Sequence, residues 1–283
     1  MNILYLGRHG QKNNDDEGSI AAAIRDLGHT LHCLNPEQVN ITMYRDFYYD
    51  LCLFHKLSDR NIRLACDYWP TAAWFFDPLN KGFAHNDNYV NSIKDKVTYG
   101  FFTDGDFVHD EGRDNFFELK QGLDLDNIPD FVAPDKYMKD VQFIGQIGPS
   151  GYSIRENYLQ ALEESYNGSI HLEYNVFKES LTAVCQNVKI MMGMVPVTDN
   201  YWSNRVYLLG GRGAFVLHPY SKSLSEEFGD LLPMFHTMDD MIDKIEYWKP
   251  RDKERAEIQV ELQKRIKEKH TYKHRVKELL GKI

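Results

Sequence analysis

The segment 201–217 places a polar helix start, an arginine and several glycines ahead of an apolar strand. Ser203 and Asn204 are residue types that cap helices, and Arg205 falls in the first turn that they would open. A helix N-terminus presents free backbone N–H groups and a guanidinium presents a planar set of donors, so both hold phosphate oxygens. This order of residues predicts a site for a diphosphate leaving group, with a purely structural capping role as the alternative.

A second glycine-rich stretch, 145–151, follows a predicted strand and precedes a predicted helix. Gly145 and Gly148 lack a Cβ atom, so the backbone there can come close to a phosphate. The spacing is not the G-x-G-x-x-G of dinucleotide oxidoreductases, and Glu173 supplies their acidic ribose ligand only ambiguously. A phosphate-binding loop and an ordinary glycine turn both stay open.

Three polar residues in the first half stand where predicted strands end. His9 follows the first strand, and because an imidazole accepts protons near neutral pH, we expect it to act as a general base. Asp77 and Asp104 follow later strands and are the reserve candidates. Asp104 and Asp106, two residues apart, could instead share a divalent cation, with solvated loop carboxylates as the simpler interpretation.

Alternating strands and helices must position these groups. Apolar β-rich runs are found at 3–6, 30–34, 51–54, 72–76 and 97–102, and again at 141–144, 170–172, 188–192 and 214–217. Helical patterns lie between them, and three more close the chain at 238–248, 252–269 and 272–280. The Asp-, Asn- and Pro-rich segment 122–139 is the predicted linker. We therefore predict two Rossmann-like α/β domains, 1–138 and 139–283, that bind ligands beyond the C-terminal ends of their strands.

The composition is typical of a soluble globular protein, with 42% hydrophobic residues among 283. A net charge of −9 argues against unassisted binding to a polyanion, because nucleic-acid affinity comes from Lys and Arg. Residues 244–283 are the exception, with 13 basic against 7 acidic residues. Neither a signal peptide nor a membrane-spanning apolar run is recognisable, so we expect a cytoplasmic protein without stable membrane insertion. Its four scattered cysteines are expected to be reduced thiols.

Three stretches after residue 200 resemble the C-terminal half of the CgeB-like glycosyltransferases, relatives of the family 1 and family 4 type. They are 203–217 with Ser-x-Arg and Gly-Ala-Phe-Val-Leu, 225–228 with Ser-Glu-Glu-Phe, and 270–275 with His-Thr-Tyr-Lys-His-Arg. The resemblance implies a GT-B fold whose second domain binds a nucleotide-diphosphate sugar, a UDP-sugar by expectation. The first domain would bind the acceptor, and the last helix would pack back on it.

The resemblance also assigns donor-binding roles in the second domain. It implies that Lys189 joins Arg205 at the diphosphate, and it includes Tyr207 and Gly213 in the donor motif. No metal and no other cofactor is needed in this scheme. Several GT-B enzymes place their base in the loop where His9 stands.

One position departs from the pattern of the family. Many of its members carry a glutamate that holds the donor ribose, and this chain has Leu208 there. Glu226 or Glu227 on the following turn could supply the carboxylate instead. Altered donor choice and lost catalysis are the other interpretations.

The predicted function is metal-independent transfer of a hexosyl or pentosyl group from a nucleotide-diphosphate donor to an acceptor. That acceptor could be a saccharide, a small molecule or a modified DNA base. A glycosyltransferase acting on hydroxymethylated DNA bases in a phage is a narrower alternative. Two further alternatives stay open. One is a metal-dependent GT-A-type transferase using Asp104 and Asp106, and the other is a nucleotide-binding module without catalysis.

Overall fold

The computed structural model describes residues 1–9, 16–35, 38, 47–55, 59–79, 84–125, 128–132, 137–145, 153–166, 168, 170–173, 176–195 and 197–283. Contacts divide the chain into two compact units. Unit 1 contains Met1–Asp124 and Tyr272–Ile283, and unit 2 contains Leu125–Thr271.

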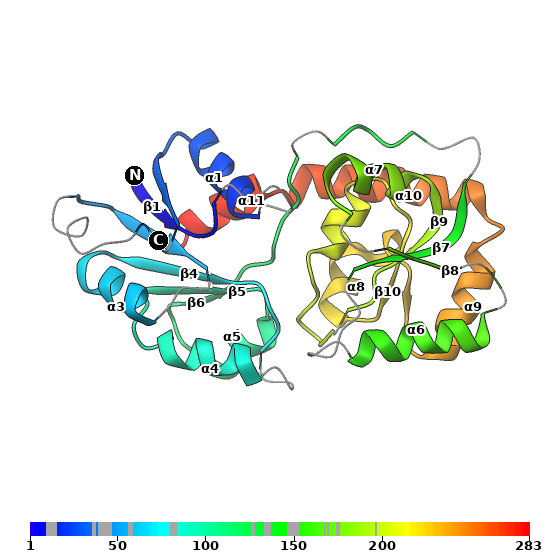
Figure 1. Ribbon diagram of the computed structural model, residues 1–283, viewed down its shortest axis with the longest axis horizontal. Helices are drawn as coiled ribbons and strands as arrows, with labels where there is room; N and C mark the ends of the chain where they lie inside the picture. Colours follow the sequence, from blue (N-terminus) through cyan, green and yellow to red (C-terminus); the bar gives the residue numbers. More distant parts are fainter. Residues whose placement is uncertain are drawn as a thin grey trace. The chain divides into compact units, whose positions relative to one another are not determined.

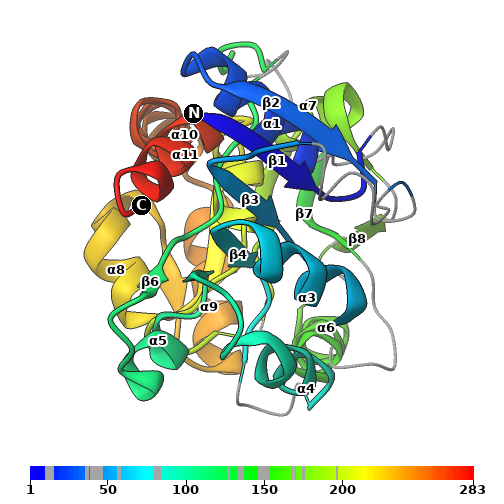
Figure 2. The same cartoon turned by 90° about the vertical axis from the view of Figure 1, so that its left-hand side faces the viewer.

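Unit 1 is built on a parallel sheet with the strand order β2-β1-β3-β4-β5-β6. Its strands are β1 (Asn2–Leu6), β2 (Thr30–Leu34), β3 (Leu51–Phe54), β4 (Thr71–Phe75), β5 (Tyr99–Phe102) and β6 (Phe116–Glu118). Its helices are α1 (Asp16–Asp26), α3 (Asp59–Tyr68), α4 (Ala84–Ile93), α5 (Gly105–Glu111) and α11 (Tyr272–Leu280). In Figure 2, which looks at unit 1, the sheet runs from β2 through β1 and β3 to β4.

Both faces of this sheet are buried, as expected for parallel strands between helices. Ile3 and Tyr5 of β1 point into a core shared with α1 and α11. The alternate residues, Leu4 and Leu6, point into the opposite core with α3, α4 and α5. Figure 1 shows α1 and α11 above the sheet and the other three helices below it.

Unit 2 repeats the architecture with a parallel sheet in the order β11-β10-β9-β7-β8. Its strands are β7 (Lys139–Ile144), β8 (Ile170–Glu173), β9 (Val188–Met192), β10 (Val216–Pro219) and β11 (Met234–Phe235). Its helices are α6 (Ser153–Ser165), α7 (Lys178–Gln186), α8 (Lys222–Phe228), α9 (Met238–Trp248) and α10 (Asp252–Lys269). Two short turns join them, the π-helical η2 (Val206–Gly210) and the 3₁₀ turn η3 (Gly229–Leu231).

The faces of the second sheet are covered differently. Apolar side chains of α6 and α9 form a core with β7, β9 and β10 on one face. The π-helical turn η2 packs against β10, α7 and α10 on the other. Figure 1 shows α6 below this sheet and α7 and α10 above it.

The units divide within the predicted linker, at Asp124/Leu125, earlier than the predicted domain boundary at 138/139. The reason is that the middle of the linker packs on α10: the Phe131 N–H donates to Gln263 Oε1 at 2.8 Å. The last helix belongs to unit 1, where the Tyr272 hydroxyl donates to Asp16 Oδ1 at 2.6 Å. The chain therefore crosses between the units twice.

Candidate active site

Strand order selects one place in each sheet for a ligand. In an open parallel sheet, ligands bind beyond the C-terminal ends of the strands where successive connections turn to opposite sides. That point lies between β1 and β3 in unit 1 and between β7 and β9 in unit 2.

Arg205 lies at this point in unit 2. Its guanidinium donates to the carbonyl oxygen of Ile144, the last residue of β7, and lies 5.1 Å from the ring centre of Phe143. Gly145 follows with a φ of +145°, a conformation that L side chains rarely adopt, and a Cβ there would collide with the Arg205 guanidinium. The structure thus brings together the predicted donor-binding residues Gly145 and Arg205, and a side chain at 145 would have to displace the arginine from this position.

A second guanidinium, that of Arg155 on α6, was missed in the sequence. Its Nε donates to the Met194 carbonyl at 3.2 Å, just beyond β9, and its Cζ lies 5.4 Å from the Phe143 ring centre. Arg155 is buried, whereas Arg205 is partly accessible. An arginine two residues into an amphipathic helix gave no signal because only the fold shows that Phe143 contacts both guanidinium groups.

The expected capped helix at 204–209 is instead one π-helical turn. Arg205 occupies its N-cap position, and no side chain caps it. The Ser203 hydroxyl accepts the Arg205 N–H at 3.3 Å, and the Asn204 carbonyl accepts the Leu208 N–H at 2.8 Å. A turn this short has only a small dipole. The expected anion-binding helix N-terminus is therefore wrong, and we attribute anion binding here to the Arg205 guanidinium.

His218 of β10 is a buried imidazole near Arg205. Its Nδ1 lies 2.7 Å from the Pro219 carbonyl oxygen, while its buried Nε2 has no hydrogen-bond partner within the described part of the chain. Burial lowers the pKa of His218 to about 4, and the nearby charge of Arg205 adds to this shift. The imidazole is therefore neutral at physiological pH.

This neutral state predicts a pH dependence of stability. Above pH 6.5 the ring is neutral in the folded and the unfolded chain, but between pH 6.5 and about 4 only the unfolded chain takes up the proton. The free energy of unfolding should fall across that window by roughly 3 kcal/mol through His218. Urea unfolding of His218→Asn should show a correspondingly flatter pH dependence than wild type, and equal slopes would contradict this.

Lys189 lies at the wrong end of the sheet for the predicted diphosphate contact. It is the second residue of β9 and forms a 2.7 Å ion pair with Asp140, the second residue of β7. Asp140 and Gly145 are separated by roughly 16 Å of extended strand. The proposed contact of Lys189 with the donor is therefore corrected.

Tyr207 and Gly213 are part of the scaffold of unit 2. The Tyr207 side chain is 1% exposed and stacks on His270 with ring centres 5.4 Å apart. Gly213 has a φ of +87° and contacts Phe131 where a Cβ would clash. Neither presents surface to a donor, which corrects both assignments.

The two glutamates of α8 differ in their surroundings. Glu227 Oε1 lies 3.1 Å from His270 Nε2 and 3.4 Å from Arg265 of α10, so it is held against that helix. Glu226 is exposed and stays a candidate for the ribose contact. Leu208 is partly exposed on η2, and Gly148 lies outside the described residues.

A hollow of about 870 Å³ lies elsewhere in unit 2, beside the edge strand β11. Its lining includes the carboxylates of Asp230, Asp240 and Asp243 but only one ammonium group, that of Lys244. A diphosphate is disfavoured there by charge. The donor site is therefore better placed at the ends of β7 and β9.

His9 lies at the corresponding point of unit 1. Its backbone N–H donates to Asn35 Oδ1 at 2.7 Å, and its Nε2 lies 3.0 Å from the Tyr5 carbonyl oxygen. Because a carbonyl only accepts, Nε2 carries the proton, and Nδ1 is left as the basic nitrogen. Asp77 follows β4 and is partly exposed.

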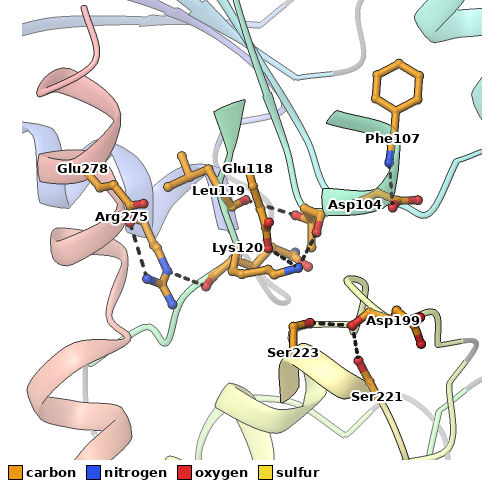
Figure 3. A network of polar contacts seen from close by, with 12 residues as sticks. Asp104, Phe107, Glu118, Leu119, Lys120, Asp199, Ser221, Ser223, Arg275 and Glu278 are labelled. Carbon is orange, nitrogen blue, oxygen red and sulfur yellow. Dashed lines mark hydrogen bonds and ion pairs between the residues drawn. The ribbon is translucent and has the colours of Figure 1, made fainter. Parts of the chain in front are cut away.

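Asp104 serves the structure of unit 1. One carboxylate oxygen accepts the Leu79 N–H at 2.8 Å. The other accepts the Phe107 N–H at 3.3 Å and so caps α5 (Figure 3). The residue is 1% exposed, and burial raises its pKa. Figure 3 also shows Lys120 beside this cap. Its Nζ donates to the Thr103 carbonyl oxygen at 2.9 Å. These contacts favour His9 and Asp77 over Asp104 as bases.

Asp104→Ala should therefore destabilise the protein without abolishing catalysis. Loss of the cap and an unpaired Leu79 N–H should lower the free energy of unfolding by roughly 2–4 kcal/mol. Urea unfolding and kcat at low temperature measure the two effects separately. A large loss of kcat with unchanged stability would return Asp104 to the catalytic candidates.

Comparison with known proteins bears on the second half of the chain and on the fold. Residues 142–281 match a family model described as glycosyl transferase-like. This segment, just under half of the chain, is therefore similar to a glycosyl transferase-like domain. The matched part includes the second half of β7, both guanidinium groups and α11, the helix that belongs to unit 1. Among curated proteins, none shows significant sequence similarity.

Solved structures resemble the fold of both the matched segment and the rest of the chain. An alpha-glucosyltransferase in complex with UDP and DNA containing an HMU base has a TM-score of 0.66 and 9% identity, covering 100% of this chain and 99% of that one. HepE of Anabaena, in complex with UDP and glucose, has a TM-score of 0.65 and 10% identity, covering 99% of this chain and 98% of that one. Sucrose-phosphate synthase of Thermosynechococcus elongatus has a TM-score of 0.72 and 8% identity, covering 99% of this chain and 98% of that one.

The predicted GT-B fold, with two Rossmann-like units, is confirmed, which rules out the GT-A fold of the metal-dependent alternative. Metal independence stays a prediction. The prediction of a glycosyltransferase is confirmed at the level of domain and fold. Within the described ranges, no three His, Cys, Asp or Glu side chains gather as a metal site would require. Asp104 and Asp106 are therefore not part of such a group. Among the helices described, none has the length and apolarity to span a membrane.

Proposed function

We propose that this protein transfers a sugar from a UDP-sugar to an acceptor, with the donor held by unit 2 and the acceptor by unit 1. The observation that carries the proposal is the arrangement around Phe143, where Arg155 and Arg205 lie at the ends of β7 and β9 within the matched domain. Fixed positive charge there would stabilise the departing diphosphate as the glycosidic bond to it breaks. The finer resemblance to the CgeB-like enzymes is part of this proposal.

His9 is the proposed general base for an inverting transfer. Its Nδ1 would take the proton of the acceptor hydroxyl as that oxygen attacks the anomeric carbon, and the diphosphate would leave with the bonding electrons. Asp77 is the reserve base. A retaining enzyme would not need either residue.

A turnover screen tests the proposal. The protein is incubated with UDP-glucose and other UDP-, GDP-, ADP- and dTDP-sugars, with simple saccharides as acceptors, and release of the nucleoside diphosphate is measured. UDP-glucose is the first choice because HepE is seen with UDP and glucose. UDP binding without release from any donor would favour the non-catalytic module.

Activity is expected to survive excess EDTA. The reason is that two guanidinium groups near the end of β7 supply the positive charge that the diphosphate needs. Turnover is compared before and after EDTA treatment, with and without added Mn²⁺. Loss in EDTA that Mn²⁺ restores would contradict metal independence.

A DNA base is the second candidate acceptor. It is favoured by the likeness to an alpha-glucosyltransferase in complex with HMU-containing DNA and by the basic segment 244–283. The acidic remainder of the chain opposes it, since 1–243 carries 20 basic and 35 acidic residues. Transfer of labelled glucose to a hydroxymethylated duplex but not to saccharides would select this function, and its rate should fall steeply with salt.

A further inference from the structure

A buried histidine, His55, follows β3 directly at the switch point of unit 1. Its Nδ1 lies 2.8 Å from the Trp74 carbonyl oxygen and its Nε2 lies 2.6 Å from the Tyr5 hydroxyl. Burial lowers the pKa of His55, so the ring is neutral. Because the Trp74 carbonyl can only accept, Nδ1 carries the proton, and Tyr5 donates its hydroxyl hydrogen to Nε2.

Tyr5 connects His55 to His9. The phenol ring is fully buried and meets the His9 imidazole edge to face, with ring centres 4.8 Å apart and planes at 78°. The carbonyl oxygen of the same residue accepts the His9 Nε2–H. Tyr5 therefore contacts the base through its ring and its carbonyl, while its hydroxyl is held by His55.

The charged surroundings of this group come from α1 and from the loop after β1. Glu17 acts on His55 to raise its pKa, and the charge of His9 acts to lower it. Behind Tyr5, the Tyr272 hydroxyl donates to Asp16. The His55 ring stays neutral in this setting because desolvation outweighs the attraction of Glu17.

We propose that His55 is a positioning residue for the base: by holding the Tyr5 hydroxyl, it fixes the ring orientation of His9 and keeps Nδ1 as its basic nitrogen. This inference rests on the proposed role of His9. An apolar side chain could fill the space of the His55 ring without any hydrogen-bond partner. A buried imidazole needs a partner at each nitrogen, and these two hydrogen bonds fix the positions of the groups that form them. His55 is expected to act on His9 only through Tyr5.

Three variants test the contact. His55→Leu removes both hydrogen bonds, Tyr5→Phe removes only the hydroxyl, and His55→Gln can still donate to Trp74 and accept from Tyr5. We expect His55→Leu and Tyr5→Phe each to lower kcat about tenfold, with an unchanged KM for the donor, and the double variant to lose little more. His55→Gln should recover most of the loss, and the exposed His109→Ala is the matched control.

The tautomer of His9 gives a readout that packing alone would not move. In ¹⁵N spectra of the full chain we expect the Nε2–H form of His9 to predominate in wild type and in His55→Gln. In His55→Leu the two tautomers should approach the mixture of a free imidazole, and the acidic limb of the pH–rate profile should shift. An unchanged tautomer and profile, or equal losses in the Gln and Leu variants, would overturn the inference.

The two proposals fail in different ways. If His9→Ala keeps its kcat, the role of His9 as base is refuted, whatever happens at His55. If His9→Ala is inactive while His55→Leu keeps both the rate and the His9 tautomer, only the role of His55 is refuted. Spectra of Tyr5→Phe provide the answer even where His55→Leu does not fold.

Discussion

His9→Ala is expected to lower kcat by about 10²–10⁴, the usual contribution of a general base, with donor binding nearly unchanged. The physical reason is that the His9 Nε2–H is bonded to the Tyr5 carbonyl, which leaves Nδ1 to accept a proton, while the guanidinium groups assigned to the donor belong to unit 2. The acidic limb of the pH–rate profile should disappear with the imidazole. The measurement is kcat at saturating substrate across pH, with UDP affinity determined in parallel.

Two carboxylate variants act as controls for this result. Asp77→Asn tests the reserve base, and Asp104→Asn tests a residue that caps α5. A near-normal His9→Ala beside an inactive Asp77→Asn would move the base to the end of β4. A structural histidine would instead lower thermal stability or raise KM while leaving kcat within a few-fold.

Arg205→Ala is expected to lower donor turnover by roughly 10- to 150-fold, because a charged hydrogen bond contributes about 1.5–3 kcal/mol. The Arg155→Ala/Arg205→Ala double variant should lose more, since both guanidinium groups lie near the same anion. Steady-state kcat/KM for the donor measures the effect, and circular dichroism checks the fold. Arg205 also donates to the Ile144 carbonyl, so a modest loss of stability accompanies the change.

Lys189→Ala is the matched control for charge. It removes a cation from the same sheet but at the opposite end, where Asp140 is its partner. Because the pair is about a third exposed, its loss should cost at most about 1 kcal/mol and leave kcat/KM unchanged. If Lys189→Ala lost as much turnover as Arg205→Ala, the location of the donor site would be wrong.

The sequence predicts the fold of this protein well because parallel strands are short, apolar and regularly spaced. Every strand expected in 3–6, 30–34, 51–54, 141–144 and 188–192 is present, with bounds that differ by at most a few residues. The two that were missed, β6 and β11, span Phe116–Glu118 and Met234–Phe235. Runs of two or three residues are too short to show a period.

The site was predicted only where local chemistry and fold agree. Gly145 and Arg205 combine a glycine after a strand with an arginine after a polar turn, and the structure places them in contact. Lys189 was misplaced because a motif gives residue types without saying at which end of a strand each one lies. His55 and Arg155 gave no signal because neither belongs to a motif, and only the fold places them against Tyr5 and Phe143.

The most direct test of the donor site is titration of UDP, UMP and uridine into the protein in EDTA, followed by calorimetry. Binding should strengthen from uridine to UMP to UDP, because the guanidinium groups near Phe143 bind phosphate, and Arg155→Ala/Arg205→Ala should abolish the advantage of UDP. Equal affinity for UDP and uridine, or a double variant that binds UDP as tightly as wild type, would contradict the assignment of this site.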